Sequence, residues 1–242
     1  MDASDVVAGL RRRHERSQQP SSMALVATID AVNETLDINK LDKSIIAYFG
    51  ACMSPLERAS LLEDVETVTA LCTLLASVMS HIPGQYLRSK FTTISSIVGS
   101  ILKGMQSSGQ VAGQRAAMQC LVHCLRHVDI SATWAPAKAP FLQLVRGTMD
   151  SNPKVRKIAA DGLAEVMAAA CLNSAVQAAA SKELASGALP ACPVEAIHPP
   201  EIIFLHDVMC RRTPVEVHRL SNTPHRALST GGCRLVTEPP VW

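Results

Sequence analysis

The chain has 242 residues, of which 48% are hydrophobic and only 3% aromatic, and its formal net charge is +2. A composition this poor in aromatic residues disfavours β-sandwiches and favours helices packed on helices. The nearly balanced charge excludes a uniformly basic nucleic-acid-binding chain, so any contact with nucleic acid must come from a local patch.

The apolar residues and the cysteines indicate an intracellular protein without a membrane partner. No apolar run approaches the roughly 18 residues that cross a bilayer. The arginines near the N-terminus are not followed by the apolar stretch of a secretory signal. The eight cysteines are scattered through helical patterns, which is typical of reduced thiols.

From residue 21 onward, apolar residues recur at three- and four-residue steps in four successive segments. Each segment is predicted to hold two helices, and the segments cover residues 21–50, 64–103, 109–150 and 153–187. Their first helices are expected to begin near residues 21, 64, 109 and 153, about 43 to 45 residues apart, within the range of HEAT and armadillo repeats. Because each helical pair leaves an apolar face that the next pair covers, the pattern predicts an all-α solenoid.

Prolines are expected to mark the turns between these helices, because a proline removes a helical hydrogen bond. Pro55 interrupts the apolar pattern of the first segment, and Pro83 lies in the turn of the second. Pro136 and Pro140 are predicted to form the turn of the third segment. A single long helix over residues 86–102 is predicted to follow the turn at Pro83.

The junction over residues 150–163 carries the clearest local signal. Asp150 and Asn152 offer side-chain oxygens to unpaired backbone N–H groups, and Pro153 suits the first position of a helix. Gly162 is small enough to let this helix approach a neighbour closely. The pattern resembles the turn and second helix of a HEAT repeat, where the arginine bonds to an acid or carbonyl of the adjacent turn. Asp150, Asn152, Pro153 and Arg156 are therefore interpreted as structural residues.

Three groups of cationic side chains are candidate contacts for RNA or a protein partner. They are Arg11, Arg12 and Arg13 near the N-terminus, Arg88 and Lys90 at the start of the predicted long helix, and Lys154 and Lys157 after the 150–153 turn. The N-terminal group fits a nuclear address or a phosphate contact as well as it fits a solvated helix face. The two later pairs are expected to lie on one edge of the array.

Four residues of zinc-ligand types, Cys120, His123, Cys124 and His127, lie on one side of a predicted helix. One straight helix rarely surrounds an ion tetrahedrally, so the cysteines are interpreted as core residues and the histidines as boundary residues. A small helical metal-binding protein remains an alternative. The sequence has no nucleophile elbow and no glycine-rich phosphate loop, so we expect neither an enzyme nor a cofactor nor a small-molecule substrate.

Three short segments give the chain a narrower resemblance. They are Ala47-Tyr48-Phe49, Leu87-Arg88-Ser89-Lys90-Phe91 after His81-Ile82-Pro83, and Asn152-Pro153-Lys154-Val155-Arg156-Lys157-Ile158-Ala159. Over about residues 20–185 the chain resembles the amino-terminal HEAT region of the ribosomal-RNA-processing-twelve-like (RRP12-like) family. The resemblance implies a nuclear and nucleolar α-solenoid that associates with pre-ribosomal particles. It also implies binding of pre-ribosomal RNA, ribosomal proteins or nuclear transport factors, and no catalytic residues.

We expect three regions along the chain: a basic N-terminal extension over residues 1–20, a HEAT-like repeat domain over 21–187, and a tail over 188–242. The tail holds eight of the fourteen prolines and is predicted to be irregular or disordered. The alternative to a ribosome-biogenesis factor is a HEAT-like adaptor for another nuclear or transport partner.

Overall fold

The computed structural model describes residues 3–58, 64–130, 132–169, 178–179 and 182. Within those residues the chain is helical and contains no strand, which confirms the predicted all-α class. The helices are α1 (Ala3–Glu15), α2 (Pro20–Ile38), α3 (Ile45–Glu57), α4 (Val65–Met79), α5 (Gly84–Ser89), α6 (Phe91–Ser107), α7 (Val111–Leu125), α8 (Trp134–Gly147) and α9 (Pro153–Ala169). None of these helices is long and apolar enough to cross a membrane.

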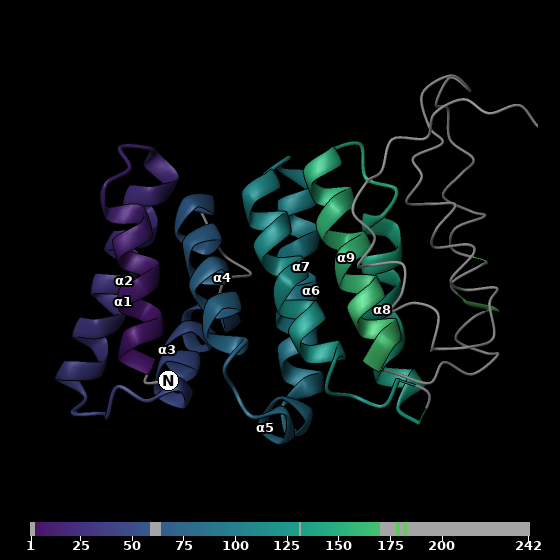
Figure 1. The fold of residues 1–242 in the computed structure, drawn as a ribbon, viewed down its shortest axis with the longest axis horizontal. Coiled ribbons are helices and arrows are strands. Elements are labelled where there is room, and N and C mark those ends of the chain that lie inside the picture. Colours follow the sequence, from purple (N-terminus) through teal and green to yellow (C-terminus); the bar gives the residue numbers. More distant parts are fainter. Residues whose placement is uncertain (1–2, 59–63, 131, 170–177, 180–181, 183–242) are drawn as a thin grey trace, which may run out of the picture. The chain divides into compact units, whose positions relative to one another are not determined.

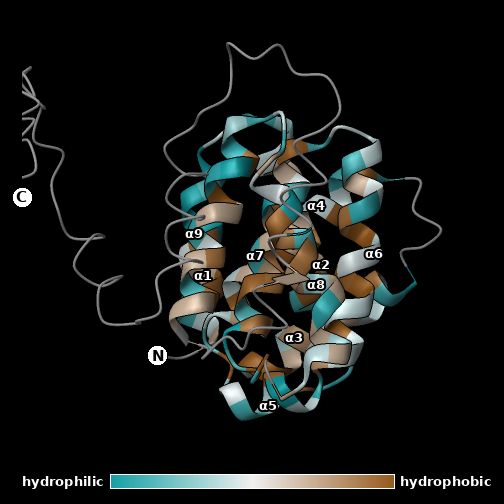
Figure 2. Cartoon of the chain, turned by 90° about the vertical axis from the view of Figure 1, so that its right-hand side faces the viewer, coloured by the Kyte–Doolittle hydropathy of each residue, from teal (hydrophilic) through white to brown (hydrophobic). Residues whose placement is uncertain are grey.

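The helices from α2 to α9 form two packed layers (Figure 1). Layer 1 consists of α2, α4, α7 and α9, which pack side by side in this order. Layer 2 consists of α3, α6 and α8, which contact one another more sparsely and pack against layer 1. Hydrophobic residues concentrate between the layers, as the end-on view shows (Figure 2), so the array has one continuous core.

The layer 1 helices recur with the predicted period. They begin at Pro20, Val65, Val111 and Pro153, which gives steps of 45, 46 and 42 residues. The pairing of helices differs from the prediction, however. From α2 onward, the consecutive helices that pack most extensively are α3 with α4, α6 with α7, and α8 with α9. Each hairpin therefore begins one helix earlier than the predicted segments, and the turn at residues 150–153 lies inside the α8–α9 hairpin.

This connectivity defines two edges of the array. The upper edge contains the connections α1–α2, α6–α7 and α8–α9, and the lower edge contains the connections α2–α3, α4–α6 and α7–α8 (Figure 1). The short helix α5 lies within the α4–α6 connection, at the lower edge. Cationic residues at the two edges are separated by the length of a helix, which for the 14 residues of α8 is about 20 Å.

Two predicted proline breaks are wrong. Helix α3 continues through Pro55 to Glu57, and α8 begins at Trp134 and continues through Pro140. Pro136 is the third residue of α8, where a backbone N–H has no helical partner to lose. Pro55 and Pro140 are each followed by a buried core residue, Leu56 at 2% exposure and Phe141 at 0%. Burying these side chains offsets the missing hydrogen bond, because a large apolar side chain contributes about 2–3 kcal/mol.

The predicted helix over residues 86–102 is divided. Lys90 ends α5 and precedes α6, with φ −105° and ψ 7°, so the two helices meet at an angle that one continuous helix does not have. Leu87 of α5 and Phe91 of α6 are both buried. The division lets both side chains enter the core from the lower edge.

The predicted N-terminal extension contains a helix that packs on the repeats. Helix α1 lies against α2 and α4, on the side of layer 1 away from layer 2. Its buried residues Ala3, Val6, Val7 and Leu10 have the i, i+3, i+4, i+7 spacing of an amphipathic helix. The second helix predicted for the last segment and the tail over 188–242 lie outside the described residues, apart from 178–179 and 182, which are helical.

Candidate functional site

The α8–α9 turn at the upper edge is closed by its own side chains. Asp150 Oδ1 accepts a hydrogen bond from the Asn152 backbone N at 2.8 Å, and Asn152 Oδ1 accepts one from the Lys154 backbone N at 2.9 Å. Arg156 Nη1 donates to the carbonyls of Asp150 and Ser151 at 2.8 and 2.9 Å. Pro153 is the first residue of α9. These contacts satisfy polar groups that the helix end leaves unpaired and stabilise the turn.

Lys154 and Lys157 project from this turn into solvent. Both residues are exposed, and the Lys157 side chain is 77% accessible. Lys157 Nζ lies 3.4 Å from Asp161 Oδ2, which is itself 63% accessible. An ion pair this exposed is weak and exchanges readily for a phosphate. Both lysines are therefore positioned by a rigid turn and accessible to an anionic partner.

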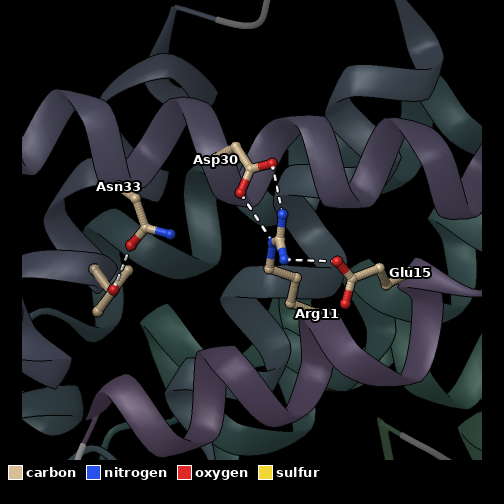
Figure 3. Close-up of polar contacts among 5 residues, drawn as sticks. Arg11, Glu15, Asp30 and Asn33 are labelled. Carbon is tan, nitrogen blue, oxygen red and sulfur yellow. Dashed lines mark hydrogen bonds and ion pairs between the residues drawn. The ribbon is translucent and has the colours of Figure 1, made fainter.

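The N-terminal arginines divide into one that is engaged and two that are exposed. Arg11 Nε lies 3.0 Å from Asp30 Oδ1 of α2, and Arg11 Nη1 lies 2.9 Å from Glu15 Oε1 (Figure 3). The hydrogen bond and charge of Asp30 raise the pKa of Arg11. Arg11 thus ties α1 to α2. Arg12 and Arg13 are exposed, and Arg13 Nε reaches only the Gly9 carbonyl at 3.4 Å.

Arg88 and Lys90 lie in the α4–α6 connection at the lower edge. Arg88 Nε donates to the backbone carbonyl of His127 at 2.9 Å, so α5 is joined to the end of α7. Lys90 is exposed. The expectation that this pair shares an edge with Lys154 and Lys157 is wrong, because the α8–α9 turn lies at the upper edge (Figure 1). The sequence shows that both pairs lie near the start of a helix, but it does not show at which edge of the array each helix starts.

The four residues of zinc-ligand types are distributed between the core and its boundary. Cys120 and Cys124 are fully buried, Cys120 lies beside Cys72, and burial raises the pKa of the Cys124 thiol to about 12. Burial, followed by the charge of Arg126, lowers the pKa of His123 to about 4. Among the residues that the structure describes, no three His, Cys, Asp or Glu side chains are arranged to hold a metal ion.

A groove of about 320 Å³ crosses the exposed face of layer 1 near the upper edge. Its floor comes from α4 and α7, and α1 with α2 on one side and α9 on the other form its walls. The lining residues are His14, Ser21, Leu25, Thr69, Ala70, Thr73, Ala112, Arg115, Ala116, Gln119 and Ile158. The sequence interpretation missed Arg115. Its spacing from Ala112 and Gln119 marks an exposed stripe of α7, but the groove exists only once four other helices surround that stripe.

The repeated hairpins and the closed turn at residues 150–156 define a helical-repeat scaffold of the HEAT class. Residues 1–190 match the family described as RRP12-like, N-terminal HEAT repeats, and the chain belongs to this family. The matched region begins at residue 1 and therefore includes α1. No curated protein and no solved structure matches the chain.

Proposed function

We propose that the chain is a non-catalytic scaffold that binds pre-ribosomal particles in the nucleus and nucleolus and assists ribosomal RNA maturation and nuclear export. The match to the RRP12-like N-terminal HEAT repeats over residues 1–190 carries this proposal. The bound partner is pre-ribosomal RNA or a ribosomal protein, and nuclear transport factors are further partners in export.

The upper edge supplies the contacts to RNA in this proposal. Arg12 and Arg13 at the end of α1 and Lys154 and Lys157 at the start of α9 are all exposed cations at this edge. Cations of this kind bind phosphates without reading sequence, and each phosphate contact adds to the salt dependence of binding. Their backbones belong to ordered turns and helices, so binding has to order only the side chains.

The experiment measures binding of the purified chain to a fluorescently labelled precursor ribosomal RNA fragment over about 50 to 200 mM salt. The double variant Lys154→Gln with Lys157→Gln is expected to reduce the slope of log K against log salt by about 1 to 2. The control variant Arg88→Gln with Lys90→Gln removes the same charge from the lower edge and is expected to keep the slope.

Two outcomes count against the proposal. If neither the RNA fragment at low salt nor pre-ribosomal protein from nucleolar extract is retained by the chain, the scaffold function is wrong. If RNA binds and both double variants lower the slope equally, the RNA contacts are spread over both edges and the assignment to the upper edge is wrong.

A further inference from the structure

The groove and helix α1 lie next to each other on the exposed face of layer 1. Helix α1 packs on α2 and α4, and its residues Ala3, Val7 and Leu10 belong to the common core. His14, one turn further along α1, lines the groove, so the groove begins where the contact surface of α1 ends. The exposed face of layer 1 is therefore covered by α1 over α2 and α4, and the groove beside α1 is the next place on this face where a helix could pack.

The floor of the groove has the chemistry of a helix contact surface. Leu25, Ala70 and Ala116 are buried residues that nevertheless border the groove, and Ile158 is half-buried on its α9 side. Small side chains let a helix approach α4 and α7 closely. A volume of about 320 Å³ accommodates a few apolar side chains from one face of a helix, and it is too small for a folded domain.

The lining of the groove carries positive charge at Arg115. Arg115 is the only residue in the lining with a permanent charge, and none of the lining residues is a carboxylate. One turn above the groove lie Lys154, four residues before Ile158 on α9, and Glu66, four residues before Ala70 on α4. The charge next to these lining residues is therefore mixed, and Arg115 carries the complementarity. His14 adds an imidazole, whose Nδ1 lies 3.1 Å from Ser22 Oγ. A partner with carboxylates along its rim complements this arrangement.

The same lining does not suit nucleobases. It contains no aromatic side chain on which a base can stack, and stacking is a main source of affinity for single-stranded nucleic acid. We propose that the groove docks an acidic amphipathic helix of a partner protein, whose apolar side chains enter between α1 and α9 and whose carboxylates face Arg115. Lys154 borders both this groove and the RNA contacts of the upper edge, but Arg115 and the apolar lining belong to the groove alone.

The test uses a displayed library of 14-residue amphipathic peptides. One face is varied among Ala, Val, Leu, Ile and Met, and the other among Glu, Lys, Gln and Ser. The library is selected on the intact chain and counter-selected on the Ala112→Trp variant, in which an indole on an exposed lining residue fills the groove. Enriched peptides are synthesised and their affinities measured by fluorescence anisotropy. Circular dichroism verifies that each variant is folded.

The expected result is a set of enriched peptides with more Glu than Lys. Arg115→Glu should weaken their binding about tenfold or more, since it places like charges opposite each other. Lys138 is an exposed residue of α8 in layer 2, far from the groove lining. Lys138→Glu makes the same charge reversal there and should leave peptide binding unchanged. Peptides that bind Ala112→Trp as well as the parent chain, enrichment of Lys over Glu, or failure to enrich any peptide would each overturn the proposal. Displacement of the peptides by polyuridylate RNA, abolished in Arg115→Glu, would assign the groove to RNA instead.

Discussion

The α8–α9 turn at the upper edge and the α4–α6 connection at the lower edge both have a proline at a helix start and cations that follow it in the sequence. At the upper edge, Arg156 bonds within its own turn, to the carbonyls of Asp150 and Ser151. At the lower edge, Arg88 bonds to His127 in the next connection along that edge. The arginines therefore hold the scaffold together in two different ways, whereas Lys154 and Lys157 contribute little to the fold and are accessible to a partner.

The position of the α8–α9 turn depends on close packing of α9 against α7. A methyl group on Gly162 would overlap Val122 of α7, so the two helices approach too closely there for a side chain. We expect Gly162→Val to lower the free energy of unfolding by about 3 kcal/mol, the upper range for overpacking a core. Ala168→Val, at an exposed position of α9, is the matched control and should cost less than about 1 kcal/mol. Equal denaturation midpoints for the two variants would show that α9 is not fixed and that the upper turn is not rigid.

A second prediction concerns how the free energy of unfolding changes at acid pH. We expect a half-buried histidine near the lower edge, His123, to cause most of this change. His123 in the last turn of α7 is half-buried, and its pKa is lowered to about 4, mainly by burial. The His123 imidazole binds a proton near pH 6.5 in the unfolded chain but only near pH 4 in the folded chain. The free energy of unfolding is therefore highest above pH 6.5 and falls as the pH drops towards 4. The loss is about 2 kcal/mol after allowing for the partial exposure of the ring.

Chemical denaturation at a series of pH values checks this prediction. His123→Gln should remove most of the loss between pH 6.5 and 4, because glutamine does not titrate. His81→Gln, which changes an exposed histidine at the same edge, should retain it. An unchanged pH profile in His123→Gln would mean that other groups cause the acid sensitivity and that the lower edge does not bury a titrating residue.

The third prediction measures how much the arginine of the upper turn contributes. Arg156 is half-buried and donates two hydrogen bonds to carbonyls. Because bonds from charged donors are stronger than neutral ones, Arg156→Gln should cost about 1.5 kcal/mol. Hydrogen exchange should rise at the amides of Asn152 and Lys154, which the turn protects. Unaltered stability and exchange would show that Asp150, Asn152 and Pro153 are sufficient to close the turn.

The sequence predicted the features that depend on local patterns. Asn152 and Pro153 mark a helix start because capping and proline preference act within one turn, and the 3.6-residue periodicity placed the layer 1 helices within two residues of their observed starts. The pairing of hairpins was not predictable in this way. Each helix has apolar residues towards both of its chain neighbours, and only the packed structure shows that α6 pairs with α7 more extensively than with α4.

The remaining errors have the same origin. Pro140 predicts a turn locally, but the burial of Phe141 in the assembled core keeps the helix intact. Arg115 is an ordinary exposed residue of α7 until α1 and α9 form walls on either side of it. The apolar spacing of α1 is also present in the sequence, within the predicted basic extension, but its packing against α2 and α4 is visible only in the structure. Sites formed by several repeats are thus invisible to a pattern that is read along one helix.

The smallest expected change in unfolding free energy tests most directly whether the cations of the two edges differ in their contribution to the fold. Arg88→Gln removes one hydrogen bond between connections and should cost about 1 kcal/mol, whereas Lys157→Gln removes only the exposed contact with Asp161 and should cost less than about 0.5 kcal/mol. Both variants lose one positive charge, so a difference in their unfolding free energies reports the contact and not the net charge. If Lys157→Gln destabilises the chain as much as Arg88→Gln does, Lys157 is a structural residue. The α8–α9 turn would then resemble the α4–α6 connection, where Lys90 is exposed, and Lys154 alone would be left at that turn for a partner.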